Sequence, residues 1–174
     1  MKRIDFQAID HERQAVATGR TYIGGGVGCA GCHNPPEFDI NPNSVAICKD
    51  RFGSKSLVDI VESSFESFDY PKSGVVIANS SLFFASPNYF DTTWSSIKSS
   101  IEVGGVFAGD FMGLKDSWAK SYRSPTSPLS ESDVKVLFSD FEIVRFFERD
   151  EKAKTSLGRV KHWHTYSVVA MKRR

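Results

Sequence analysis

Three glycines near the N-terminus have the spacing of a loop that holds a cofactor. From residue 22 the sequence reads Tyr-Ile-Gly-Gly-Gly-Val-Gly, which places Gly24, Gly26 and Gly28 at alternate positions. Glycines in this arrangement let a ligand approach the backbone closely, and a helix that starts after them offers N–H donors to it. These three glycines are therefore candidate cofactor-binding residues.

A cysteine and histidine motif follows these glycines directly. Cys29, Cys32 and His33 form a C-x-x-C-H sequence. This spacing can supply two thioether bonds to the vinyl groups of haem c and a histidine as axial ligand. The two cysteines could instead be half of a zinc site, although a second cysteine pair is lacking.

Two histidines, His162 and His164, lie two positions apart in a segment with strand character. Side chains at this spacing share one face of a strand, an arrangement that occurs in metal sites. No acidic or cysteine partner is evident beside them in the sequence. We therefore interpret both histidines as packing residues and predict no metal site.

The elements that must position these residues alternate between strand and helix. An amphipathic helix is expected at 4–17 and a loop with at most a short strand at 21–36. Strands are expected at 37–40, 57–61, 74–79, 104–111, 141–148 and 163–171, and helices at 41–52, from Pro87 to Ile101, and at 131–138. Alternating strands and helices predict an α/β fold with a mostly parallel sheet, and the last two strands predict an antiparallel hairpin at its edge.

Length and composition exclude several classes of protein. The 174 residues fit one domain, 1–174, and 40% hydrophobic with 25% charged residues is typical of a globular protein. The formal net charge of +1 gives no footprint for nucleic acid. No apolar run approaches the ~20 residues that span a bilayer, and the first residues lack a signal peptide's apolar core. We expect a cytoplasmic protein without nucleic-acid or membrane partners.

From about Asp39 to its end, the chain resembles class I S-adenosylmethionine-dependent methyltransferases, particularly the small-molecule group of the tellurite-resistance type. The order and spacing of several stretches carry this resemblance. They are Asp39-Ile-Asn-Pro-Asn-Ser44, Glu62-Ser-Ser-Phe-Glu-Ser-Phe68, Ile77-Ala-Asn-Ser-Ser-Leu-Phe-Phe84, Val103-Gly-Gly-Val-Phe-Ala-Gly109, Asp116-Ser-Trp118 and the final strand from Trp163 to Lys172.

The resemblance implies roles for residues at the ends of the expected strands. Asp39 would accept hydrogen bonds from both ribose hydroxyls of S-adenosylmethionine. Ser64 and Phe65 would flank the adenine, and Asn79 and Ser80 would lie near the methionine part or the methyl acceptor. Purely structural roles stay open as alternatives. Asp39 could cap a helix or turn, Phe65 could belong to the core and Ser80 could be an ordinary turn residue.

The first βα unit departs from the family pattern. Tyr22 stands where the family has an acid, and Pro35 and Pro36 cannot continue a helix after the glycines. Residues 18–38 instead resemble the haem-attachment region of dihaem cytochrome c peroxidase-like proteins. We therefore predict a degenerate or missing first βα unit within an atypical N-terminal segment, 1–38. A chimeric chain with a seam near residues 39–44 accounts for both resemblances, and a divergent methyltransferase loop is the milder alternative.

Three functions follow from these patterns. The first is methyl transfer from S-adenosylmethionine to a small-molecule acceptor. Holding the two reactants in line can promote this reaction without a catalytic triad. The second is electron transfer or peroxidase-like chemistry by a c-type haem fragment. The third is an inactive, methyltransferase-like binding module.

Overall fold

The computed structural model describes residues 21–24, 36–52, 59–122, 124–155 and 158–174. Its strands are β1 (Thr21–Gly24), β2 (Pro36–Asp39), β3 (Asp59–Glu62), β4 (Ser73–Ala78), β5 (Ile101–Met112), β6 (Phe141–Lys154) and β7 (Val160–Lys172). Its helices are α1 (Pro42–Phe52), the 3₁₀ helix η2 (Leu82–Phe84), α2 (Phe90–Ser100), α3 (Trp118–Ser121) and α4 (Glu131–Leu137). The expected strands and helices within the described residues are present, while the helix expected at 4–17 lies outside them.

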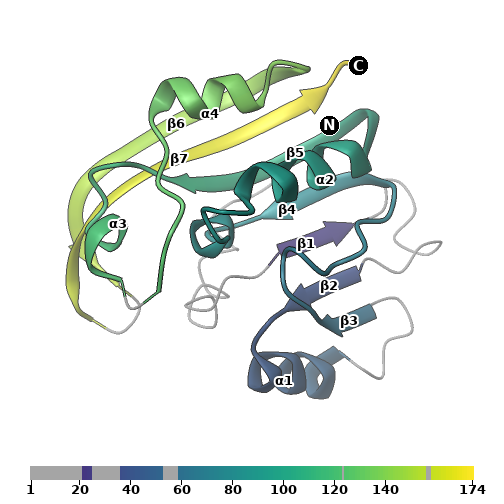
Figure 1. The fold of residues 1–174 in the computed structure, drawn as a ribbon, viewed down its shortest axis with the longest axis horizontal. Helices are drawn as coiled ribbons and strands as arrows, with labels where there is room; N and C mark the ends of the chain where they lie inside the picture. The colour runs from purple at the N-terminus through teal and green to yellow at the C-terminus, as the bar shows by residue number, and fades with distance from the viewer. Residues whose placement is uncertain (1–20, 25–35, 53–58, 123, 156–157) are drawn as a thin grey trace.

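The seven strands form one sheet in the order β3-β2-β1-β4-β5-β7-β6 (Figure 1). The first five positions of this order are those of a Rossmann-like sheet. The pairings make β2, β3, β4, β5 and β6 run in one direction, with β1 and β7 opposed to them. The prediction of a mostly parallel, Rossmann-like α/β sheet is therefore confirmed.

Strand β1 is reversed relative to both of its neighbours. It pairs antiparallel with β2 and with β4. A βαβ unit requires parallel strands joined by a crossover, so β1 does not begin such a unit with either neighbour. This is the structural form of the degenerate first βα unit that the sequence predicts.

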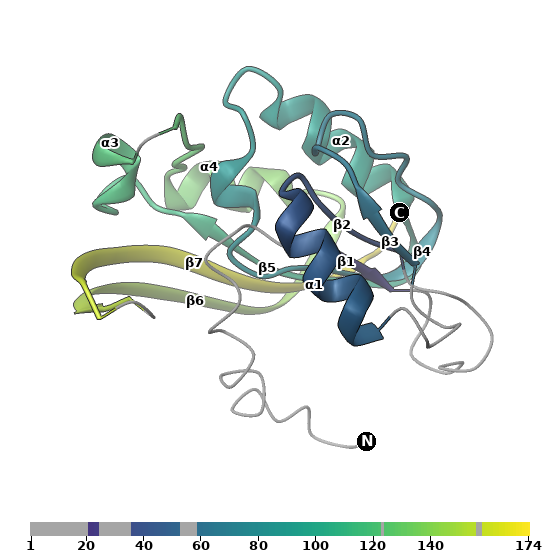
Figure 2. The ribbon, with the colours of Figure 1, turned by 90° about the horizontal axis from the view of Figure 1, so that it is seen from below.

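The last two strands form the expected antiparallel hairpin. They pair along almost their whole length, from Phe141 opposite Lys172 to Lys154 opposite Val160. Strand β7 also pairs antiparallel with β5, so β6 occupies the edge. The far end of the hairpin curls beyond the rest of the sheet, on the side where α3 lies (Figures 1 and 2).

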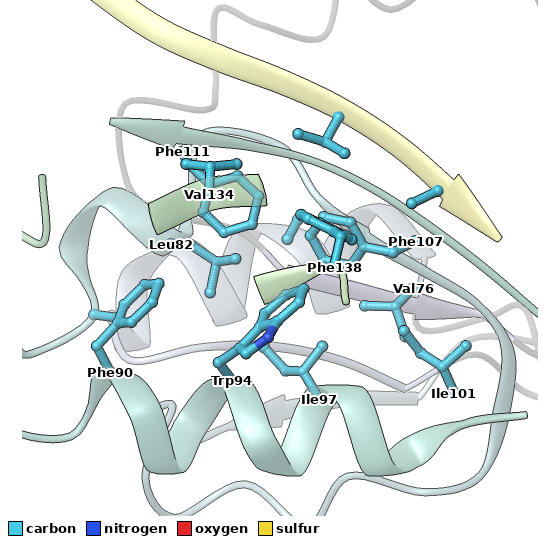
Figure 3. Packing of buried hydrophobic residues seen from close by; sticks show 14 of the residues in the cluster. Val76, Leu82, Phe90, Trp94, Ile97, Ile101, Phe107, Phe111, Val134 and Phe138 are labelled. Atoms are coloured by element: carbon cyan, nitrogen blue, oxygen red, sulfur yellow. The ribbon is translucent and has the colours of Figure 1, made fainter. Parts of the chain in front are cut away.

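The main hydrophobic core lies between one face of the sheet and helices α2 and α4 (Figure 2). The helical spacing expected from the sequence places Phe90, Trp94, Ile97 and Ile101 on the buried face of α2 and at its exit. Figure 3 shows these side chains directed toward residues of β5 and α4. Trp94 contacts the rings of Phe107, Phe111 and Phe138 at centroid distances of 5.1, 5.7 and 5.1 Å.

Helix α1 covers the opposite face of the sheet. Its residues Val45 and Cys48 form a second small core with Ile60 of β3. Because Phe38 pairs with Val61 and packs in the main core, the neighbouring Ile60 must point to the other face. Farther along this face, Ile77 of β4 is 41% exposed. Among the described residues, helices thus lie on both faces, and this second face is covered less completely.

Helix α2 begins later than the sequence suggests. Pro87 and the two residues after it form a turn, in which the N–H of Tyr89 donates to the carbonyl of Ser86. The helix starts at Phe90, the first residue of its buried stripe. Proline's fixed φ suits a turn as well as a helix start, so the sequence does not separate these two roles.

Helix α4 begins with a capping box. The Ser130 hydroxyl accepts the N–H of Asp133, and the Asp133 carboxylate accepts the N–H of Ser130. We expect Ser130→Ala to lower the free energy of unfolding by about 1 kcal/mol, because it removes the helix cap. Urea unfolding checks this, with Ser139→Ala, an exposed serine after the helix, as control. Equal stability of the two variants would contradict the capping role.

Among the described residues, no helix is both long enough and apolar enough to cross a membrane.

Candidate functional site

A pocket of about 290 Å³ lies where the strands β2 and β3 end. Carboxyl ends of strands that run in one direction meet at the same edge of a sheet, the edge at which open α/β sheets bind ligands. The loops that follow β4 and β5 supply the other wall. The lining residues are Phe38, Asp39, Ile40, Ser63, Ser64, Phe65, Glu66, Phe84, Ser86, Ser124 and Pro125.

Asp39 lies at the wall of this pocket and is only 7% exposed. Its Oδ1 atom accepts the N–H of Asn41 at 2.7 Å, and Asn41 in turn accepts the N–H of Asn43 at the start of α1. Asp39 therefore does form a turn, as the purely structural alternative predicts. The same turn holds its carboxylate at the end of β2, beside the pocket.

Ser64 and Phe65 line the same pocket, in a turn that directly follows β3. The Phe65 ring meets Phe38 edge-on at 5.6 Å, whereas Phe68 stacks on Phe38 at 4.0 Å. The Tyr70 hydroxyl donates to the Phe65 carbonyl at 3.0 Å, and burial raises the pKa of that hydroxyl above its ordinary value. Phe65 is thus fixed at the border between the core and the pocket.

Asn79 and Ser80 follow β4, but neither lines this pocket. Ser80 has a φ of 52°, a strained conformation for a residue with a side chain. Its N–H and its hydroxyl both donate to Oδ2 of Asp110 at 3.2 Å, and Oδ1 of Asp110 accepts the Ser167 hydroxyl at 2.6 Å. Asp110 was not predicted from the sequence, although an acid inside an otherwise apolar strand is a detectable signal.

Gly24, which is the only glycine of the predicted loop among the described residues, does not lie at the pocket. Gly24 ends β1 and pairs with Val75, near the beginning of β4, whereas Tyr22 pairs with Ile77 near its end. The reversed β1 therefore runs away from the edge at which Asp39 lies. Gly26, Gly28 and the motif residues Cys29, Cys32 and His33 lie outside the described residues.

The second wall of the pocket was missed from the sequence. Phe84 and Ser86 come from the connection between β4 and α2, and Ser124 and Pro125 from a serine- and proline-rich loop that precedes α4. Two hydrogen bonds tie these segments together, since the N–H of Ser127 donates to the Phe83 carbonyl and its hydroxyl donates to that of Ala85. No local sequence motif indicates that a loop lines a pocket, so this wall could not be predicted.

A buried ion pair anchors the loop after β5 to strand β7. Lys161 Nζ lies 2.5 Å from Asp116 Oδ1, and the two side chains are 5% and 0% exposed. The ammonium also lies 3.7 and 4.0 Å from the ring centroids of Trp118 and Trp163. Burial lowers the pKa of Lys161, an effect that its hydrogen bond to Asp116 opposes. This arrangement holds the segment around Trp118 against the hairpin.

The histidines of β7 have acidic partners that the sequence interpretation missed. His164 Nε2 lies 2.9 Å from Glu148 Oε1, and His162 Nε2 lies 2.6 Å from Asp150 Oδ1. Glu148, Asp150 and His164 offer ligand atoms within 4.8 Å of one another. However, His164 Nδ1 accepts the N–H of Lys115, which leaves the proton on Nε2 rather than a lone pair for a metal. The premise that no acid lies nearby was wrong, but this geometry favours a packing role.

Asp150 predicts a pH dependence of stability. The hydrogen bond from Lys115, and then that from His162, hold the pKa of Asp150 below its ordinary value. A carboxyl whose pKa is depressed in the folded state stabilises it above the unfolded pKa, and this contribution is lost as pH falls through the folded pKa. We expect the melting temperature of Asp150→Asn to fall less between pH 6 and about pH 3 than that of the wild type. Parallel melting curves would contradict this prediction.

Comparison with solved structures identifies the class of fold. TehB from Haemophilus influenzae superposes with a TM-score of 0.68 at 13% identity, over 99% of this chain and 64% of TehB. The N-methyltransferase NodS from Bradyrhizobium japonicum WM9, in complex with S-adenosyl-L-homocysteine, gives 0.61 at 9% identity, over 79% and 65%. Magnesium protoporphyrin IX methyltransferase ChlM from Synechocystis PCC 6803, with bound S-adenosylmethionine, gives 0.53 at 12%, over 78% and 57%. No family model and no curated protein matches the sequence.

The chain therefore has the fold of class I S-adenosylmethionine-dependent methyltransferases. It spans less than two thirds of the length of each of the three structures compared above. The likeness gives no support to the interpretation of residues 18–38 as a haem-attachment segment. At these identities the comparisons show the fold, so activity and substrate are matters for proposal.

Proposed function

We propose that the protein transfers a methyl group from S-adenosylmethionine to a small-molecule acceptor. One observation carries this proposal: in a methyltransferase fold, the pocket at the ligand-binding edge of the sheet is lined by Asp39, Ser64 and Phe65. These are the residues for which the resemblance to methyltransferases implies contacts with the adenosine part of the cofactor. The pocket has a volume of about 290 Å³, which is near the lower end of the range for pockets that bind small molecules.

The lining residues suit the adenosine half of the cofactor. The Asp39 carboxylate, held by its turn, can accept hydrogen bonds from the two ribose hydroxyls. Phe65 offers a ring to the adenine, and the adjacent Ser64 and Glu66 offer polar atoms to its exocyclic amine. Asn79 and Ser80, with Asp110, would flank the methionine half at the end of β4.

The cofactor, when bound, supplies a methyl group on a sulfonium, and its transfer is an in-line displacement. This chain's residues would bind and orient the cofactor and the acceptor, and would exclude water from them. These effects can promote such a displacement without a nucleophilic side chain. The two tied loops that carry Phe84 and Ser124 would close the pocket on the acceptor side.

The reversed β1 favours a second candidate function, a binding module that holds the cofactor or a related nucleoside without turnover. Gly24 lies away from the pocket, so the described residues offer no glycine loop to the methionine half. A methyl-transfer assay with labelled cofactor separates the candidates, because the binding module would bind S-adenosylhomocysteine and transfer nothing.

Isothermal titration with S-adenosylhomocysteine tests the proposed site. We expect saturable 1:1 binding to the wild type and about tenfold weaker binding to Phe65→Leu, because stacking of a base on an aromatic ring contributes about 1–3 kcal/mol. Tyr89→Leu is the matched control, since Tyr89 is 55% exposed and lies outside the pocket. The absence of binding to the wild type would overturn the proposal.

A further inference from the structure

Phe84, which follows β4 and lines the pocket, belongs to a cluster of three aromatic side chains. Phe84 lines the pocket, and its ring lies 5.0 Å from Tyr122 and 6.1 Å from Trp118. The rings of Trp118 and Tyr122 lie 5.2 Å apart. All three are half-buried. We call Phe84, Trp118 and Tyr122 the aromatic wall.

The aromatic wall is held in place before any ligand binds. Leu82 and Phe83 of η2 are each 1% exposed, which anchors the short helix that ends with Phe84. On the other side, the buried Lys161 ammonium packs against the ring of Trp118 and holds it in place. The Thr126 hydroxyl also donates to the Trp118 carbonyl at 3.3 Å. A rigid aromatic surface loses little conformational freedom when a ligand packs on it.

The charges around the pocket restrict what this wall can accept. Among the described lining residues, the ionisable side chains are Asp39 and Glu66, both acidic. A negatively charged ligand in the same pocket would be repelled by them. Aromatic faces, by contrast, attract flat apolar rings and cations.

We propose that the methyl acceptor is a planar aromatic compound without negative charge, and that it packs on Phe84, the ring of the aromatic wall that lines the pocket. This inference rests on the proposed function, because it places the acceptor beside the cofactor pocket. It assigns to Phe84 the selection of the acceptor by ring planarity, and to Asp39 and Glu66 the exclusion of negative charge. Phe84 follows β4, whereas the residues assigned to adenosine come from the ends of β2 and β3, so we expect it to discriminate acceptors without holding the cofactor.

Three probes that share a ten-carbon bicyclic skeleton test the proposal. They are 2-naphthol, which is planar and neutral, 2-naphthoate, which is planar and anionic, and decahydro-2-naphthol, which is neutral and not planar. Binding is measured by saturation-transfer NMR titration of the full chain with S-adenosylhomocysteine present. We expect 2-naphthol to bind at least tenfold more tightly than either of the other two probes.

Phe84→Leu keeps an apolar side chain but removes the flat ring. It is expected to weaken 2-naphthol binding about tenfold while leaving the affinity for S-adenosylhomocysteine within twofold, and Tyr89→Leu should change neither. Equal binding of the three probes, or no effect of Phe84→Leu, would overturn the inference even where S-adenosylhomocysteine binds. Selective 2-naphthol binding without S-adenosylhomocysteine binding would support the planar site and overturn the proposed methyl transfer.

Discussion

Replacing Lys161 by methionine is expected to lower the free energy of unfolding by about 3–5 kcal/mol. Its ammonium is the partner of the fully buried Asp116 carboxylate, and the substitution removes the cation that compensates this carboxylate. The N–H groups of Trp118 and His164 also donate to Asp116, but these two hydrogen bonds do not replace the lost positive charge. The cation–π contacts with two tryptophans are lost as well.

Urea unfolding measures this effect, with Lys152→Met on the exposed part of β6 as control. The double variant Lys161→Met with Asp116→Asn should be less destabilised than the sum of the two single variants, because it removes both charges. A loss below about 1 kcal/mol in Lys161→Met would show that the buried pair does not anchor the loop.

Asp39→Ala is expected to weaken S-adenosylhomocysteine binding by about 100-fold. Each hydrogen bond to a charged acceptor contributes about 1.5–3 kcal/mol, and the proposed contact with the ribose uses two. The binding is measured by isothermal titration at neutral pH.

The turn role of Asp39 requires a second variant. Asp39→Asn keeps the oxygen that accepts the Asn41 N–H but replaces the other oxygen with a donor. It should preserve the melting temperature and still weaken binding about tenfold or more. Unchanged affinity in Asp39→Asn and Asp39→Ala would leave the residue with its turn role alone.

Much of the fold follows from periodic patterns that local physics makes reliable. The stripe from Phe90 to Ile101 predicts a buried helix face, and the apolar run before Asn79 predicts a central strand. The consecutive final strands predict the antiparallel hairpin. The direction of β1 could not be predicted, because four residues carry no signal that distinguishes parallel from antiparallel pairing.

The candidate site was predictable only where a residue lies at the end of a strand or shortly after it. Asp39, Ser64 and Phe65 meet at one pocket because β2 and β3 are parallel neighbours. Other features depend on contacts between segments far apart in the sequence. These are the aromatic wall, the contacts of Lys161 with Asp116 and two tryptophans, and the acidic partners of His162 and His164. Such contacts leave no pattern in a single chain, so the structure was needed to find them.

Amide chemical-shift mapping with S-adenosylhomocysteine tests the central claim most directly. Titration of ¹⁵N-labelled protein should shift the amide signals of residues 39–41 and 63–66, with smaller shifts at 79–81, while the amides of the β6–β7 hairpin end at 150–155 stay in place. That pattern would place the cofactor in the pocket at the ends of β2 and β3. Saturable binding that leaves residues 39–41 and 63–66 unshifted would contradict the account, because the cofactor would then bind elsewhere.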